Sequence, residues 1–446
     1  MTSTLRRAGG FAAVGTLSLA APALGVAAAA PFAAIAVLAA FVITDGPVFE
    51  LFARPGDREE GRLNGLASFA LAATGLALLA TVPRTPMPVG LFVSTVVVVA
   101  YGNLGAQFVT TRSTPLDDSL APVVGFVTLG FLAGVAGQIV VALAAATAVS
   151  LPAFAFVAAT ATLVAALVRS ALHERDDPVV VLSAGILVWL FDALALRVGA
   201  VEIGVAIAVT VVLGYASYAL GTASVTGMLT GGLFGLLTIV LGGFGWFVVL
   251  TSFFAIGGLS TKFRYEEKRA RGVAEDNDGA RGSSNVLGNA VVAFVAVVGF
   301  AASLRLATPL PVDTAFGFAF AGSVAAAMSD TLSSEIGGLY DRPRLITTFQ
   351  PVPPGTDGGV TWQGEVAGVV GAVLVAGLAL LLMPLSGPVA FVVVIVVVGG
   401  VAGMTVDSVL GATLEGDRIG NEAVNLLATL TGALVSGGVA LAVLPG

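Results

Sequence analysis

The stretch from Gly387 to Thr405 reads GPVAFVVVIVVVGGVAGMT and contains no charged residue. A run of about 20 apolar residues is long enough to cross a bilayer as a helix. Hydrophobic residues make up 57% of the chain and charged residues only 11%, whereas a soluble domain carries about 25% charged residues. The sequence therefore predicts an all-α polytopic membrane protein, whose first partner is the lipid bilayer.

Runs of this kind recur along the whole chain, and they predict about 15 transmembrane helices. The expected spans are 8–28, 31–49, 63–83, 88–108, 121–145, 152–170, 178–197, 199–219, 223–241, 243–260, 286–304, 312–330, 362–383, 387–405 and 421–443. Gly and Ala occur in nearly all of them, which suits close helix packing in lipid.

The remaining composition excludes several classes of function. The chain has no Cys and a single His, so disulfides, thiolate nucleophiles and His-rich metal sites are excluded. The formal net charge of −7 argues against nucleic acid as a partner. The acidic composition, with Lys only at positions 262 and 268, favours a salt-loving archaeon. The sequence gives no indication of the oligomeric state.

The basic residues predict the orientation of the chain. With the N-terminus inside and the spans alternating, all Lys and Arg fall in inside loops except Arg84, Arg197 and Arg305. Cytoplasmic loops carry such an excess of Lys and Arg. The N-terminus and all the polar loops discussed below are therefore expected on the cytoplasmic side of the plasma membrane. The first apolar run resembles a signal peptide, and we interpret it as a retained span.

Similar loops at similar places suggest an internal repeat. Seven spans, a linker span at 199–219 and seven further spans would give two halves of the same orientation. Aligning Leu104 with Leu332 places Gly102 opposite Asp330 and Gln107 opposite Glu335. Residues 1–198 would then be a degenerate repeat that serves as a scaffold or holds lipid, and residues 199–446 would carry the motif loops. The alternative is that Gly-, Ala- and Val-rich helices simply look alike.

A long polar stretch, SDTLSSEIGGLYDRPRLITTFQPVPPGTDGGVTWQGE, runs from Ser329 to Glu365. Its acids Asp330 and Glu335 would lie about 140° apart on a continuous helix. If the helix ends after Asp330, both can approach one ion. Mg²⁺ prefers oxygen ligands of this kind. The alternative is two solvated acids at a helix end.

The turn PVPPGTDGGVT, Pro351 to Thr361, lies inside this stretch. Its glycines allow positive φ angles, and successive N–H groups of such a turn form anion nests. A span begins directly afterwards, so its N-terminal dipole points at the same place. The turn is therefore a candidate phosphate site, or else a stiff interhelical connection.

Two further segments carry polar groups into the bilayer. KFRYEEKRARGVAEDNDGAR, from Lys262 to Arg281, supplies six cations and is followed by Asn285 and Asn289 on one helix face. The second segment, 407–425, contains Asp407, Ser408, Glu415, Asn421 and Asn425. Polar side chains in the membrane mark sites or pathways. The alternatives are a solvated loop that fixes topology and amides that bond between helices.

Taken together, these motifs resemble a known family of membrane proteins. The order Lys262, Arg281, Asn285, Asn289, then SDTLSSEIG, RPRLITT and VPPGTDGGVT, then DSVLGATLE and GNEAVNLL is similar to that of the family containing plant phytyl-phosphate kinase and eukaryotic transmembrane protein 19. The resemblance covers roughly residues 200–446. The chain departs from the family at residues 331–334, often Trp-Ala-Ser there, and at Glu415, commonly Gln.

The resemblance implies Mg²⁺-dependent phosphorylation of an isoprenyl monophosphate, such as phytyl or geranylgeranyl phosphate, to its diphosphate at the cytoplasmic face. The donor would be a nucleoside triphosphate, CTP or ATP. Phosphoryl transfer depends mainly on positioning and charge neutralisation. The alternative is a transporter or lipid flippase, which a two-halved bundle also suits. A non-catalytic assembly protein is a third reading.

We assign the site residues to three roles. The catalytic and Mg²⁺-binding residues would be Asp330, Glu335 and Asp407. The phosphate- and nucleotide-binding residues would be Lys262, Lys268, Arg281, Thr347, Thr348, Pro354, Gly355, Thr356, Gly358 and Gly359. The orienting residues would be Asn285, Asn289, Ser408, Glu415, Asn421 and Asn425.

Overall fold

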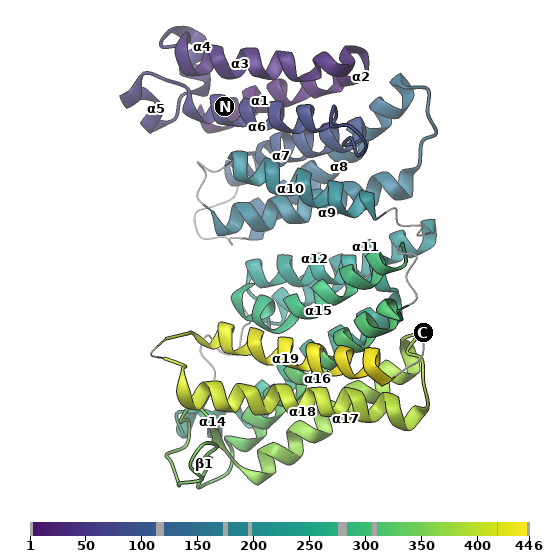
Figure 1. Cartoon of the computed structure of the whole chain (residues 1–446). Helices are drawn as coiled ribbons and strands as arrows, with labels where there is room; N and C mark the ends of the chain where they lie inside the picture. Colours follow the sequence, from purple (N-terminus) through teal and green to yellow (C-terminus); the bar gives the residue numbers. More distant parts are fainter. Residues whose placement is uncertain are drawn as a thin grey trace. The chain divides into compact units, whose positions relative to one another are not determined.

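A computed structural model describes residues 3–112, 120–172, 177–194, 199–274, 283–305, 310–416 and 418–443 (Figure 1). Its packing divides the chain into two compact units, Met1–Val209 and Thr210–Gly446. Each unit is described separately. The expected division of roles between the two halves of the chain stays a prediction.

The first unit is built from helices. Their bounds are α1 Ser3–Thr16, α2 Ala21–Leu24, α3 Ala30–Phe41, α4 Gly46–Phe52, α5 Pro55–Glu60, α6 Asn64–Leu79, α7 Val89–Thr110, α8 Leu120–Ala144, α9 Leu151–Ala171 and α10 Asp177–Ala193, with 3₁₀ turns η1 Leu17–Ala20 and η2 Gly25–Ala29. Helix α11, Ala200–Ala219, crosses the boundary between the units.

The second unit adds one small β-ribbon to its helices. The elements are α12 Val225–Gly242, α13 Phe244–Lys262, α14 Tyr265–Ala270, α15 Ser283–Ser303, α16 Val312–Gly337, β1 Arg344–Leu345, β2 Gly359–Val360, α17 Trp362–Leu382, α18 Val389–Thr413 and α19 Asn421–Val443. The two strands pair antiparallel, with Arg344 opposite Val360.

The expected fold class is confirmed. The number of spans is lower than expected, because some of the expected spans correspond to helices that are too short or that belong to one longer segment. Among the described residues, 12 helical segments are long and apolar enough to cross a membrane. The expected span 8–28 and most of the expected span 31–49 lie in one such segment, Thr4–Phe41, and the end of the second span falls in α4. That segment turns at Gly25, which has φ +54°, and α4 returns to contact α1. Helices α6 and α10, with 16 and 17 residues, occupy two more expected spans but are shorter.

One helix in each unit forms the centre of its bundle. Every residue is buried from Leu91 to Ala100 in α7 and from Phe320 to Ser329 in α16. Glycines allow the close approach that such burial needs, because a Cβ on Gly322 of α16 would lie 2.4 Å from the carbonyl oxygen of Gly432 on α19. Small residues at helix crossings are the usual means of packing in lipid.

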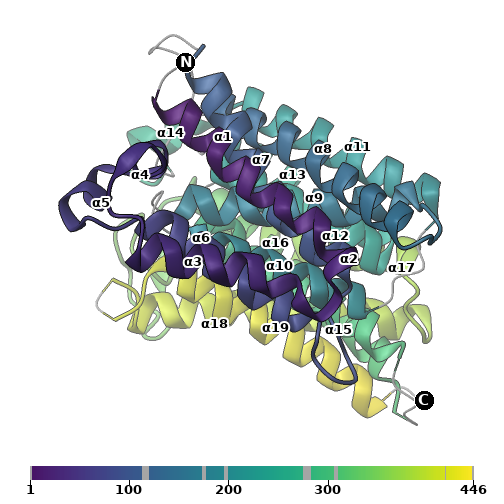
Figure 2. The same ribbon diagram turned by 90° about the horizontal axis from the view of Figure 1, so that it is seen from above.

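The last five long helices of each unit share one pattern of neighbours. Helix α7 contacts α6, α8, α9 and α10, and α16 contacts α15, α17, α18 and α19 in the same way. The remaining contacts also correspond, since α6·α10, α8·α9 and α9·α10 match α15·α19, α17·α18 and α18·α19. Two repeats of the expected order would produce this arrangement. Figure 2 gives a second view of these helices.

The first two helices of each unit do not follow that order. Helix α3 contacts α6 and α1 contacts α7, whereas α12 contacts α15 and α13 contacts α16. By its contacts, α3 therefore corresponds to α12 and α1 to α13, which reverses their order along the chain. Helix α16 also continues to Gly337, beyond the expected end at residue 330, because its last two turns pack against protein and need not be apolar.

Candidate functional site

A polar cavity of about 410 Å³ lies at the end of the second unit where α16 and α18 finish and α17 and α19 begin. Most of the residues assigned from the sequence line it. These are Asn285, Asn289, Asp330, Glu335, Pro354, Gly355, Thr356, Gly358, Gly359, Asp407, Ser408, Glu415, Asn421 and Asn425. Three segments that are distant in the sequence therefore form one cavity, while the roles assigned to these residues stay predictions.

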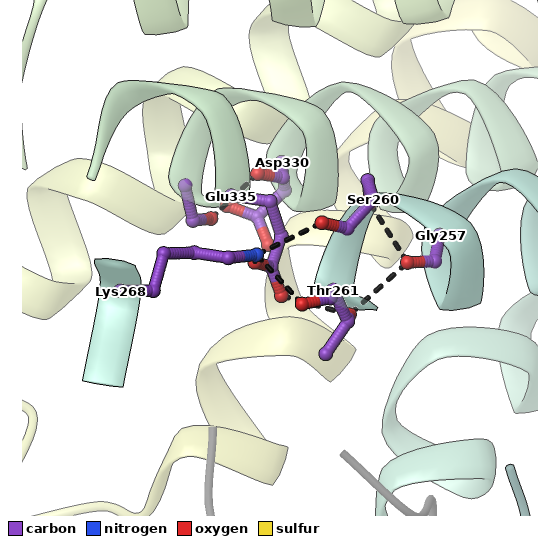
Figure 3. A network of polar contacts seen from close by, with 7 residues as sticks. Gly257, Ser260, Thr261, Lys268, Asp330 and Glu335 are labelled. Atoms are coloured by element: carbon purple, nitrogen blue, oxygen red, sulfur yellow. Dashed lines mark hydrogen bonds and ion pairs between the residues drawn. The ribbon is translucent and has the colours of Figure 1, made fainter. Parts of the chain in front are cut away.

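Glu335 takes part in a buried ion pair at the edge of this cavity (Figure 3). Lys268 of α14 is 1% exposed, and its Nζ lies 2.5 Å from Glu335 Oε2. The same ammonium donates to the carbonyl oxygens of Ser260 at 2.8 Å and Thr261 at 2.7 Å. The other carboxylate oxygen accepts from the Thr261 hydroxyl at 2.8 Å. These contacts fix α14 and the end of α13 against α16.

This pairing changes the roles expected for both residues. An ammonium has three N–H donors, and those of Lys268 are taken up by Glu335 and two carbonyls, so none is left for a phosphate. Both Glu335 oxygens likewise have partners. Helix α16 is continuous through this region, so the break after Asp330 that would bring both acids to one ion does not occur. We therefore assign Lys268 and Glu335 a structural role.

Three other residues predicted to bind phosphate do not line the cavity, namely Lys262, Thr347 and Thr348. The Lys262 Nζ donates to the Leu220 carbonyl at 3.2 Å and lies beside a different, apolar groove. Thr347 and Thr348 are exposed in the turn after β1. Arg281 lies outside the described residues. Lys262 therefore adds no positive charge to the described lining of the cavity.

Asp330 and Asp407 form the acidic centre of the cavity. Asp407 is half-buried, and its side chain is adjacent to that of Asp330. Within the part of the chain that is described, Asp407 Oδ1 and Asn285 Oδ1 are buried without a hydrogen-bond partner. Buried oxygens of this kind are rare in proteins, and two adjacent carboxylates repel unless a cation or proton lies between them.

This donor set fits a hard cation such as Mg²⁺. Among the described residues no three acidic or histidine side chains are grouped closely enough to hold a metal alone. Mg²⁺ does not require such a cage, because it is usually bound by one or two carboxylates together with water and substrate phosphates. Asp330 and Asp407 supply the two carboxylates, and the unpartnered amide oxygen of Asn285 is a further oxygen donor.

The Gly-rich turn packs directly on α18. Gly355 and Gly358 have φ of +82° and +72°, values that residues other than glycine rarely adopt. A Cβ on Gly358 would lie 2.5 Å from the Ser408 carbonyl oxygen. The N–H groups of Thr356 and Gly359 bond within the turn, to Pro353 and Thr356. The expected anion nest stays a prediction.

Replacing Gly358 with Ala is expected to destabilise this part of the site. The positive φ alone costs about 1–2 kcal/mol, and the clash with α18 backbone adds to it. Gly416 is the matched control, because its φ is +78° and a Cβ there would contact nothing within 4 Å. Thermal unfolding in detergent should give a clearly larger fall in Tm for Gly358→Ala. Equal falls would mean that the turn can move off α18.

The sequence assignment omitted Asp357, which also lines the cavity. The turn was assigned for its glycines and backbone N–H groups alone, although the sequence shows an acid between Thr356 and Gly358. Burial raises the pKa of Glu415, and the carboxylates of Asp357, Asp407 and Glu422 raise it further. The described lining of the cavity therefore contains several acids and no Lys or Arg, which favours cations over anions.

Comparison with known proteins identifies the family. The family model described as integral membrane protein DUF92 matches residues 208–433. The chain belongs to this family. The DUF92 region contains all the long helices of the second unit from α12 to α18 and most of α19. It therefore includes the complete cavity, and it is the family whose motifs the sequence resembles.

Individual members of the DUF92 family align over the same half. An uncharacterized membrane protein of Methanocaldococcus jannaschii is 36% identical over 215 residues, covering 47% of this chain and 82% of that protein. An uncharacterized membrane protein of Synechocystis is 32% identical over 208 residues, 45% of this chain and 77% of that protein. The chloroplastic protein VTE6 of Arabidopsis thaliana is 32% identical over 224 residues, 48% of this chain and 64% of that protein. No solved structure matches the chain.

Proposed function

We propose that the protein phosphorylates an isoprenyl monophosphate, such as phytyl or geranylgeranyl phosphate, at the polar cavity of its second unit. The observation that carries the proposal is the adjacent carboxylate pair Asp330 and Asp407, set in an amide-lined cavity at a helix end. The family resemblance supplies the substrate class. The cavity would lie at the cytoplasmic face of the plasma membrane and open to the cytoplasm, where nucleoside triphosphates are found.

The reaction requires little from protein side chains beyond charge and position. An oxygen of the prenyl monophosphate forms a bond to the terminal phosphorus of CTP or ATP, and the bond to the nucleoside diphosphate breaks. The second pKa of a phosphate monoester is near 6, so the attacking oxygen is already ionised at neutral pH. No general base is needed, which agrees with a cavity whose described lining contains no His.

The acidic lining determines how phosphates would be received. Asp330, Asp407 and Asp357 would repel the phosphates of both substrates. Asp330 and Asp407 would hold Mg²⁺, which when bound neutralises phosphate oxygens and the charge that develops during transfer. The amides of Asn289, Asn421 and Asn425 can orient the phosphate groups, because each side chain offers both donors and an acceptor.

An apolar groove beside the cavity suits the prenyl tail. The groove lies among α11, α12 and α13, has a volume of about 160 Å³ and is lined mainly by Gly, with Thr, Leu and Phe. Helix α15 contributes to both, because Asn285 lines the cavity and Val286 lines the groove. A lipid phosphate could therefore place its head among the acids and its tail along the glycines.

Filling the groove is expected to impair long substrates selectively. A Cβ on Gly231, which lines the groove, would meet nothing within 4 Å, so the side chain of Gly231→Leu can start without a clash and extend into the groove. The KM should rise several-fold for a 20-carbon prenyl phosphate and much less for a five-carbon one. Gly377→Leu on α17 is the control, because Gly377 is equally open and lies away from the groove. Equal changes in KM for both chain lengths would mean that the groove does not bind the prenyl tail.

The proposal is tested with purified protein, Mg²⁺, CTP or ATP labelled at the terminal phosphate, and prenyl monophosphates. Labelled prenyl diphosphate is the expected product. If a folded protein gives no diphosphate with any pairing, the kinase proposal is wrong. Movement of an unmodified lipid phosphate across proteoliposomes under the same conditions would then favour the transporter or flippase alternative.

A further inference from the structure

The polar cavity of the second unit has one aromatic side chain among its described lining residues, that of Tyr340. Tyr340 follows the end of α16, and 41% of its surface is exposed. The parts of this unit that lie outside the described residues are 275–282, 306–309, 417 and 444–446, and they contain no Phe, Tyr or Trp. No undescribed residue of the unit can therefore add a second ring to the lining.

The lining of the cavity changes from buried to exposed along its depth. The amides of Asn289 and Asn425 are buried, and the carboxylates of Asp330 and Asp407 are half-buried. Tyr340 is exposed, so its ring lies at the mouth. A ligand that fills the whole cavity would therefore be charged at its inner end and apolar at its outer end.

Contacts on both sides of Tyr340 fix its backbone. A Cβ on Gly338 would lie 3.4 Å from Cγ2 of Val273, so the end of α16 packs against the residues that follow α14. On the other side, Asp341 Oδ1 accepts a hydrogen bond from the Arg271 guanidinium at 2.9 Å. A ring held in this way loses little further freedom when a ligand binds to it, and such preorganisation favours affinity.

The other residues at the mouth are mostly apolar. Val273, Pro343, Pro354 and Gly355 line the cavity with Tyr340, and a Cβ on Gly355 would lie 3.2 Å from Cγ1 of Val273. An exposed tyrosine ring offers its face to another flat ring, and a nucleic acid base stacks on such a face without hydrogen bonds to its edges. The mouth lies beyond the end of α16, whereas a prenyl tail belongs among the membrane helices.

We propose that Tyr340 stacks on the base of the nucleoside triphosphate, while the triphosphate extends inward to the cation site of Asp330 and Asp407. This inference rests on the proposed kinase function. The cavity volume of about 410 Å³ is large enough for such a ligand. Stacking tolerates any base, because every base has a π face, so the binding of both ATP and CTP depends on Tyr340.

Calorimetric titration of the full-length protein in detergent with Mg²⁺ tests the proposal. The ligands are ATP, CTP and inorganic tripolyphosphate, which has the charges of the nucleotide but no base. Tyr340→Leu should weaken the binding of both nucleotides about 10-fold, the scale of one stacked base, and leave tripolyphosphate binding unchanged. Tyr340→Phe keeps the ring and should bind all three ligands like the unchanged protein.

Phe349→Leu is the matched control for Tyr340→Leu. Phe349 is an exposed aromatic residue of the same connection between α16 and α17, and it is not among the lining residues of the cavity. This variant should bind nucleotides like the unchanged protein. If Tyr340→Leu lowers Tm, then Tyr340→Gln, whose side chain suits an exposed position, replaces it.

Initial rates of the transfer reaction give a second measurement. Tyr340→Leu should raise the KM for the nucleotide about 10-fold and leave the KM for the prenyl phosphate unchanged. Nucleotide binding that is as tight in Tyr340→Leu as in the unchanged protein, or an equal loss for tripolyphosphate, overturns the role of Tyr340 and leaves the kinase proposal standing. Absence of nucleotide binding from the unchanged protein contradicts both.

Discussion

Replacing Lys268 with Met should lower the stability of the second unit by about 3–5 kcal/mol, the usual effect of removing one partner of a buried ion pair. The substitution keeps the length of the side chain but leaves Glu335 as an uncompensated buried charge, with the carbonyls of Ser260 and Thr261 unbonded. A loss of this size corresponds to a fall in Tm on the order of 10 °C. Thermal unfolding of the purified protein in detergent measures it.

Two further variants show whether the pair itself causes the loss. Lys262→Met is the control, because Lys262 is the other lysine of the chain and is exposed, so its Tm should change little. The double variant Lys268→Met/Glu335→Leu should recover much of the stability, since neutral, well-packed replacements of a buried pair are often tolerated. A double variant that is no more stable than Lys268→Met alone would contradict the pairing.

Asp407→Asn should reduce the proposed transfer by at least on the order of 100-fold, the scale on which a group that stabilises transition-state charge acts. The amide keeps the shape but removes the charge that the Asp330–Asp407 pair offers a cation. Stability should hold or increase, because removal of one of two adjacent, half-buried acids relieves their repulsion, and functional sites commonly sacrifice stability in this way. Initial rates of diphosphate formation, together with Tm, measure both effects.

Asp313→Asn serves as the matched control for this variant. Asp313 lies in the first turn of α16, at the opposite end from Asp330. It should leave the rate unchanged. Full activity in Asp407→Asn, or a loss in proportion to a fall in Tm, would mean that Asp407 has no direct part in transfer.

Much of this fold can be predicted from the sequence because lipid imposes a simple rule. Runs such as Gly387–Thr405 must be helical, since the bilayer offers no partner for backbone groups. The charged loops then mark where each pair of spans ends. The motif segments around Asp330, Gly358 and Asp407 could be expected at one end of the bundle for the same reason, and they line one cavity.

The pairing of individual side chains could not be predicted in this way. Lys268 and Glu335 are 67 residues apart, and nothing in either segment indicates that one neutralises the other. The sequence did not predict that α16 continues past Asp330, because the apolar run ends there. The polar residues that follow are still helical because they pack against protein. A smaller polar cavity in the first unit is lined by residues of α1, α7, α9, α10 and the segment before α5, so no local motif marks it.

Binding of Mn²⁺, followed by electron paramagnetic resonance, tests most directly the claim that Asp330 and Asp407 form a divalent metal site that receives phosphate. The purified protein should bind Mn²⁺ more tightly when phytyl phosphate is present, and Mg²⁺ should compete for the site. Asp407→Asn should weaken this binding at least about 10-fold, whereas Asp313→Asn should not. Binding of Mn²⁺ by Asp407→Asn as tight as by the unchanged protein, with or without phytyl phosphate, would contradict the account.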